Sequence, residues 1–145
     1  MAVFRSDVNA DKTGVNLKYN AKKASQAIAE NTFVSRDAAG NLAPSTATST
    51  SITGVAVGRV TAADDDYAST SEIGYDQPRE GEVFLVDVDD AGTAGFVPGV
   101  LRTLINEGQV KAAALNGTTD VGLVVVQKVF ASTDQALVTV VTPTL

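Results

Sequence analysis

Short apolar runs with alternating flanks, separated by glycine, aspartate and asparagine, are the main pattern along this chain. The clearest run covers residues 81–89, where four apolar residues are followed by an alternation of aspartate and valine. A second run, residues 135–141, lies near the end of the chain and is followed by Pro143. Such runs are typical of strands, and the residues between them favour tight turns. About eight short strands of this kind predict an antiparallel β-barrel or sandwich.

Helical periodicity is scarce by comparison. Residues 22–30 are the best helix candidate, but their apolar positions are only Ala24, Ala27 and Ile28, and the segment fits an extended lead-in equally well. A parallel α/β fold would need crossover helices of about ten residues or more, and no amphipathic run of that length occurs. We therefore predict a mainly β fold.

Two segments, residues 51–63 and 119–131, resemble one another. Each has a Ser/Thr-rich approach and a glycine, Gly54 or Gly122, shortly before an apolar run. Each is also preceded by a Phe-Val pair, at residues 33–34 and 96–97. A repeated β unit built around glycines indicates a structural module. We expect Gly54 and Gly122 to be structural glycines that need positive φ or a closely approaching backbone.

Charge divides the chain unevenly. The net charge is −6 overall, yet residues 1–36 carry six Lys/Arg against three acids. This division predicts an N-terminal arm or lead-in, residues 1–30, ahead of a single β domain, residues 31–145. Six charges spread over 36 residues do not form a dense basic patch, so nucleic-acid binding is not expected.

The predicted arm contains apolar and charged residues without an evident core role. We predict that they form an interface with another protein, and they are Val3, Phe4, Arg5, Val15, Leu17 and Tyr19. Such segments can add a strand to the sheet edge of a neighbour and become ordered on binding. An equally good interpretation makes residues 15–19 the first strand of the barrel.

Catalytic chemistry is poorly represented. The chain has no cysteine, histidine or tryptophan, which removes disulfides, thiolate ligands and the usual general base. Two acidic groups, residues 64–66 and 87–90, are the only ligand-like clusters, and their spacing matches no EF-hand loop. We therefore predict no catalytic residue, no cofactor and no metal site, and we do not expect an enzyme. No secretory signal or membrane span is recognisable, so we expect a soluble protein made in the cytoplasm without a membrane partner.

Several motifs follow one another in a characteristic order. They are a Phe-Val strand, an Asp-x-x-Gly turn, Ile52-Thr53-Gly54-Val55-Ala56, Tyr67-Ala68, Arg79-Glu80-Gly81-Glu82-Val83-Phe84-Leu85-Val86 and Thr119-Asp120-Val121-Gly122-Leu123-Val124-Val125-Val126. In this order the chain resembles the cement or decoration proteins of tailed-phage heads, over roughly residues 30–130.

The resemblance implies a virion component on the outer surface of the capsid. Such a protein would bind a major capsid protein of the HK97-like fold, assemble as a homotrimer, and stabilise the shell by bridging capsomers. The alternatives are a tail or fibre-associated structural β-domain and a carbohydrate-binding module. A carbohydrate module would be expected to expose more aromatic residues than eight Phe and Tyr without tryptophan supply.

Overall fold

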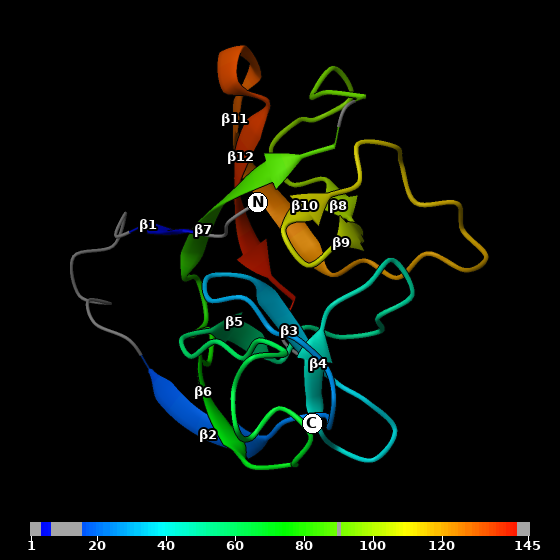
Figure 1. Cartoon of the computed structure of the whole chain (residues 1–145). Coiled ribbons are helices and arrows are strands. Elements are labelled where there is room, and N and C mark those ends of the chain that lie inside the picture. The colour runs from blue at the N-terminus through cyan, green and yellow to red at the C-terminus, as the bar shows by residue number, and fades with distance from the viewer. Residues whose placement is uncertain (1–3, 7–15, 90, 142–145) are drawn as a thin grey trace.

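The computed structural model describes residues 4–6, 16–89 and 91–141, which are almost entirely β structure (Figure 1). The only helical element among them is a short 3-10 turn, η1 (Ala131–Thr133). The strands are β1 (Phe4–Ser6), β2 (Leu17–Ala21), β3 (Phe33–Arg36), β4 (Leu42–Pro44), β5 (Gly54–Ala56), β6 (Glu72–Asp76), β7 (Val83–Val88), β8 (Leu101–Arg102), β9 (Leu104–Asn106), β10 (Gln109–Val110), β11 (Val124–Phe130) and β12 (Gln135–Val140). The predicted mainly β fold is confirmed. The strands outnumber the eight expected because several have only two or three residues.

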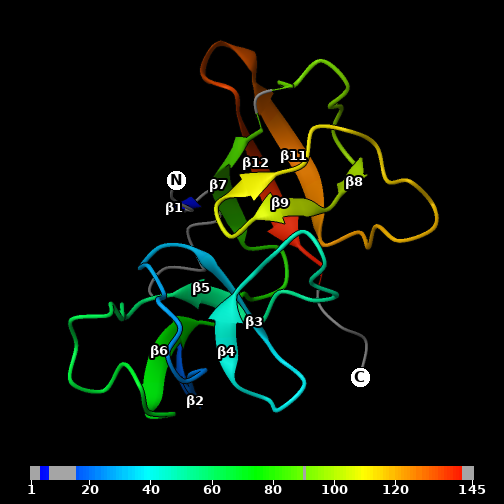
Figure 2. The same cartoon turned by 45° about the vertical axis from the view of Figure 1, so that its right-hand side comes forward.

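The first sheet is nearly closed into a barrel. Its strands follow the order β8-β11-β12-β7-β10-β9, so β8 and β9 lie at the two ends of the sheet. Only Thr103 separates these two strands along the chain, and the kinked segment 101–106 therefore joins the ends. Figure 2 shows this barrel above the second sheet.

Strand β7 has two different partners along one of its edges. One edge of β7 pairs antiparallel with β12 over residues 83–87. On the opposite edge, β10 pairs in parallel with Asp87 and Val88 only. On the same edge as β10, residues 83–85 pair antiparallel with β1. The N-terminal strand thus completes the edge of β7 where β10 does not reach.

The second sheet follows the order β2-β6-β5-β3-β4 and is mainly antiparallel. Its ends approach one another through a parallel bridge between Lys22 and Leu42. The Lys23 amide donates a hydrogen bond of 2.8 Å to the Leu42 carbonyl at the same corner. This sheet therefore also curls back on itself.

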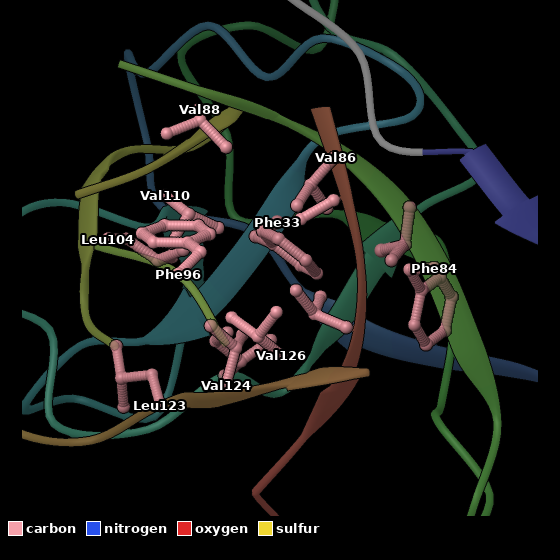
Figure 3. Close-up of a cluster of buried hydrophobic side chains, with 14 residues drawn as sticks. Phe33, Phe84, Val86, Val88, Phe96, Leu104, Val110, Leu123, Val124 and Val126 are labelled. Atoms are coloured by element: carbon pink, nitrogen blue, oxygen red, sulfur yellow. The ribbon is translucent and has the colours of Figure 1, made fainter. Parts of the chain in front are cut away.

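Alternation along the strands of the second sheet divides their side chains between two cores. Phe33 and Val55 belong to the cluster that fills the barrel, whereas Val34 and Ala56 belong to the cluster inside the second sheet. Figure 3 shows Phe33 among the side chains of the first sheet. Its ring meets Phe84 edge to face, with centroids 6.4 Å apart, a favoured aromatic geometry. Shared packing of this kind joins the two sheets into one body.

The structure decides one open alternative of the sequence analysis in favour of the extended lead-in, and it corrects one detail. Residues 22–30 contain turns and isolated bridges but no helix. Ile28 is buried and forms an isolated bridge with Val60. Pairing with this distant segment determines the conformation, because the few apolar residues of 22–30 define no helical stripe. The two similar segments are also not equivalent, since Gly54 lies inside β5 whereas Gly122 precedes β11.

The predicted arm is described only in part. Residues 17–21 form β2 and pair with β6 along its whole length, which is the alternative that makes this segment a strand of the β body. Phe4 and Arg5 lie in β1, where their backbone is described. Val3 and Val15 lie outside the described residues.

Candidate interaction surfaces

One apolar surface lies on the second sheet, and we call it the β2 strip. It consists of Leu17, Tyr19, Val57 and Gly74. Tyr19 is opposite Gly74 in the register of β2 and β6, and the Val57 amide donates to the Gly74 carbonyl at 3.0 Å. Tyr19 is 61% exposed and Val57 43%. Large apolar side chains with this exposure, gathered on one face, are candidates for a protein interface.

Gly74 explains why the β2 strip is continuous. A Cβ atom at this position would lie 3.1 Å from Leu17 Cδ1 and 3.5 Å from Tyr19 Cε1. The two side chains therefore lean over the glycine, and any side chain there would displace them. The neighbours Ile73 and Tyr75 on β6 are buried, so alternation places residue 74 on the outer face.

A second apolar surface lies on the outside of the barrel, and we call it the barrel face. Its central row crosses four strands, because Leu101 is opposite Val125, Val125 is opposite Thr139, and Thr139 is opposite Val83. A neighbouring row pairs Leu137 with Leu85. Adjacent residues such as Val124, Phe84 and Val138 are buried in the barrel, so these rows face outward.

A shallow groove of about 750 Å³ runs over the barrel face. Its apolar lining comes from Val83, Val125, Leu137, Val140 and Val141, and Glu80, Gly81, Gln127, Lys128 and Thr139 complete it. Apolar lining combined with a few polar groups is the usual composition of a binding surface.

A buried lysine directly after β2 fixes the long loop 61–71. Lys22 is fully buried, and its Nζ donates to the carbonyl oxygens of Asp66, Tyr67 and Ser69 at 2.6, 3.3 and 2.5 Å. An ammonium group removed from water requires such compensation. The loop that joins β5 to β6 is thereby held in one conformation against β2.

The barrel has a comparable buried cation. Arg102 is 5% exposed, and its guanidinium donates to the carbonyl oxygens of Gly95, Leu101 and Ala112. Its Cζ lies 5.2 Å from the centre of the Phe96 ring, within cation–π range. Arg102 therefore ties residues 95–96 and 112 to the kinked segment that closes the barrel.

The loop 111–120 is stabilised by one ion pair and by an asparagine. Lys111 Nζ lies 3.1 Å from Asp120 Oδ2, and the Asp120 side chain is 10% exposed. This hydrogen bond lowers the pKa of Asp120 below the ordinary value of 3.8. Burial of the carboxyl group opposes the effect, and a hydrogen bond from the Asn116 amide adds to it. Asn116 Oδ1 accepts from the amides of residues 118, 119 and 120 and so caps the turn.

Three of the acidic residues that suggested ligand clusters accept hydrogen bonds from loop residues. Asp64 accepts from the Thr61 amide, Asp66 from the Ser71 hydroxyl, and Asp89 from the amides of Ala91 and Ala112. Across residues 4–6, 16–89 and 91–141, no group of three His, Cys, Asp or Glu side chains is arranged to hold a metal ion. Within the same ranges, no helix has the length and apolarity that crossing a bilayer requires.

The predicted interface residues separate into two places. Leu17 and Tyr19 come together on the β2 strip, whereas Phe4 and Arg5 are opposite Leu85 and Phe84 at the edge of β7. Sequence reasoning did not identify Val57 or the barrel face. The signal for the barrel face was the continuous apolar run of residues 83–86, in which both faces of the strand are apolar.

The two predicted glycines differ in their surroundings. A Cβ at Gly54 would meet the Asp76 carbonyl oxygen in direct overlap and Tyr75 Cδ2 at 2.6 Å. A Cβ at Gly122 would meet only the side chain of Leu101, at 3.2 Å. Neither residue has positive φ, so close approach is the relevant constraint, and it is severe only at Gly54.

Comparison with known proteins does not assign the chain to a family. No protein-family description, no curated protein and no solved structure matches it.

Proposed function

We propose that this chain is a viral structural protein, a cement or decoration protein that binds the outer surface of a tailed-phage capsid. It stabilises the shell by bridging capsomers built from HK97-fold subunits, and it acts as a homotrimer. The order of motifs that resembles decoration proteins supports this identity.

The observation that carries the proposal is the pair of apolar surfaces on two different sheets. A protein that bridges capsomers as an oligomer needs one contact with the shell and another with its own copies, and the β2 strip and the barrel face supply two separate surfaces on one packed body. Each contact need not be strong, because repetition over a lattice multiplies its effect. We assign the β2 strip to the shell because its exposed Tyr19 is carried on a strand whose residues 17–21 all pair with β6. Aromatic residues on a rigid support are frequent binding hot spots.

Co-sedimentation with expanded empty heads tests this proposal. Tyr19→Lys places a charge in the β2 strip, and Val97→Lys is a matched control because Val97 is also 61% exposed and lies on a turn of the first sheet. We expect wild type and Val97→Lys to sediment with the heads and Tyr19→Lys to bind at least about tenfold more weakly, the loss of one hot spot. Circular dichroism verifies that both variants are folded.

Two results would contradict the proposal. Wild-type protein that stays in the supernatant at saturating heads would exclude a decoration role. Equal binding by Tyr19→Lys would remove the β2 strip as the shell contact. Hexameric rings in negative-stain images would instead favour a tail component, and retention on an immobilised polysaccharide would favour a carbohydrate-binding module.

A further inference from the structure

The edge of β7 contains a position that accepts a strand. Residues 83–85 pair with β1, and β10 begins its pairing only at Asp87. The other edge of β7 is already occupied by β12. Without β1, residues 83–85 would present unpaired backbone groups on this edge, and such an edge readily takes up an extended segment.

Strand β1 is described in the structure through its pairing with β7. It pairs with β7 and with no other strand described in the structure. The chain next enters the described part at Asn16, whose amide donates to Asp76 in the second sheet. The ten residue-to-residue steps from Ser6 to Asn16 span at most about 33–36 Å, which is enough to reach an adjacent copy as well as the same chain.

The acceptor position borders the barrel face. Val83 and Leu85, which are opposite Ser6 and Phe4, are also members of the two outward rows of that surface. A second copy tethered at β7 is therefore held beside Val125 and Leu137. Covering these side chains removes apolar surface from water, which favours association.

We infer that β1 is exchanged between copies of this chain, so that residues 4–6 of one copy pair with β7 of the next and the copies cover one another's barrel faces. The exchanged strand makes the same backbone pairs as the strand it replaces, which makes exchange an inexpensive route to an oligomer. The high local concentration on a capsid lattice favours it further. This inference rests on the self-association included in the proposed function, and it specifies the surface and the strand involved.

Disulfide trapping tests the exchange, because the chain has no cysteine of its own. Ser6 and Val83 are directly opposite in the register of β1 and β7. Such pairs place their Cβ atoms about 4.5–5.5 Å apart, close to disulfide geometry. The variant Ser6→Cys/Val83→Cys is purified, its oligomer fraction is collected by gel filtration, and the oxidised protein is run on a non-reducing gel. Exchange predicts covalent dimers and larger species.

A mixture of two single variants gives the more selective result. When Ser6→Cys and Val83→Cys chains are refolded together, exchange predicts a mixed disulfide that joins one chain of each kind, identified by mass. The control variant Val83→Cys/Thr139→Cys joins β7 to β12 within one chain and should close as an oxidised monomer.

Leu137→Lys should shift the oligomer to monomer while Leu17→Lys does not, since only Leu137 lies on the barrel face.

The opposite pattern would overturn the inference. Closure of Ser6→Cys/Val83→Cys as an oxidised monomer would show that β1 stays with its own chain. Absence of any Ser6–Val83 disulfide would show that β7 does not receive β1 in solution. These experiments use the purified chain alone, so failure of exchange is distinguishable from failure of head binding, which is measured by co-sedimentation.

Discussion

The buried ammonium group of Lys22 should contribute strongly to stability, and Lys22→Met tests this. Methionine keeps the unbranched apolar stem but removes the charge and three hydrogen bonds to the loop 61–71. Two of the carbonyl acceptors retain other donors, because Asp66 O also accepts from the Ser69 amide and Tyr67 O from the Ser25 amide. Ser69 O loses its only hydrogen bond described in the structure.

The expected loss follows from these partners. Hydrogen bonds from a charged donor contribute about 1.5–3 kcal/mol each, and an orphaned buried acceptor costs about 1–3 kcal/mol. The ammonium group no longer has to be desolvated in the variant, which offsets part of this loss. We expect a net decrease in unfolding free energy of about 2–4 kcal/mol. For a chain of this length, that decrease lowers the melting temperature by about 5–15 °C.

Chemical denaturation and calorimetry measure the change, and Lys23→Met is the matched control because the neighbouring lysine is exposed. Hydrogen exchange should also accelerate in the loop 61–71 of Lys22→Met but not of Lys23→Met. A Lys22→Met protein within about 1 kcal/mol of wild type would refute the reasoning, since that is less than the contribution of one such bond.

Three further predictions concern single sites. Gly54→Ala should lower the free energy of unfolding by up to about 3 kcal/mol, because the new Cβ overlaps the backbone of Asp76. Gly122→Ala should lower it by less than about 1 kcal/mol, because its Cβ meets only the Leu101 side chain; urea titration measures both. Thr103→Val should leave stability unchanged or raise it by up to about 1 kcal/mol, because the buried Thr103 hydroxyl has no partner among the described residues; a clear loss of melting temperature would argue against this account. The carboxylate of Asp120, whose pKa is lowered by Lys111, should stabilise the fold above pH 3.8 and progressively less below it. The melting temperatures of wild type and Asp120→Asn should therefore differ at pH 7 and converge as the pH falls below the lowered pKa of Asp120, and a constant difference would contradict the assignment.

The strands that could be predicted from sequence are those formed by long apolar runs between turn residues. Residues 83–88 and 135–140 are such runs, and both are central strands of the barrel. Strands β8 and β10 have two residues each, too few for any pattern to show. Closure of the barrel at Thr103 depends on pairing between distant segments, which local sequence does not encode.

The candidate surfaces were predictable only in part. Leu17 and Tyr19 were identifiable because no core role was evident for them, and the structure places both on one exposed strip. The barrel face was not predicted, because a continuous apolar run such as residues 83–86 normally indicates a strand that is buried on both faces. The burial of Lys22 could not be foreseen, since lysine is almost never fully buried unless its charge is compensated by partners that only the fold brings together.

Electron cryomicroscopy of expanded heads incubated with the purified chain tests the proposed function most directly. The account predicts added density on the outer surface at threefold or quasi-threefold positions, with the second sheet and its exposed Tyr19 against the shell. Heads without added density, or density confined to the tail or the interior, would contradict it.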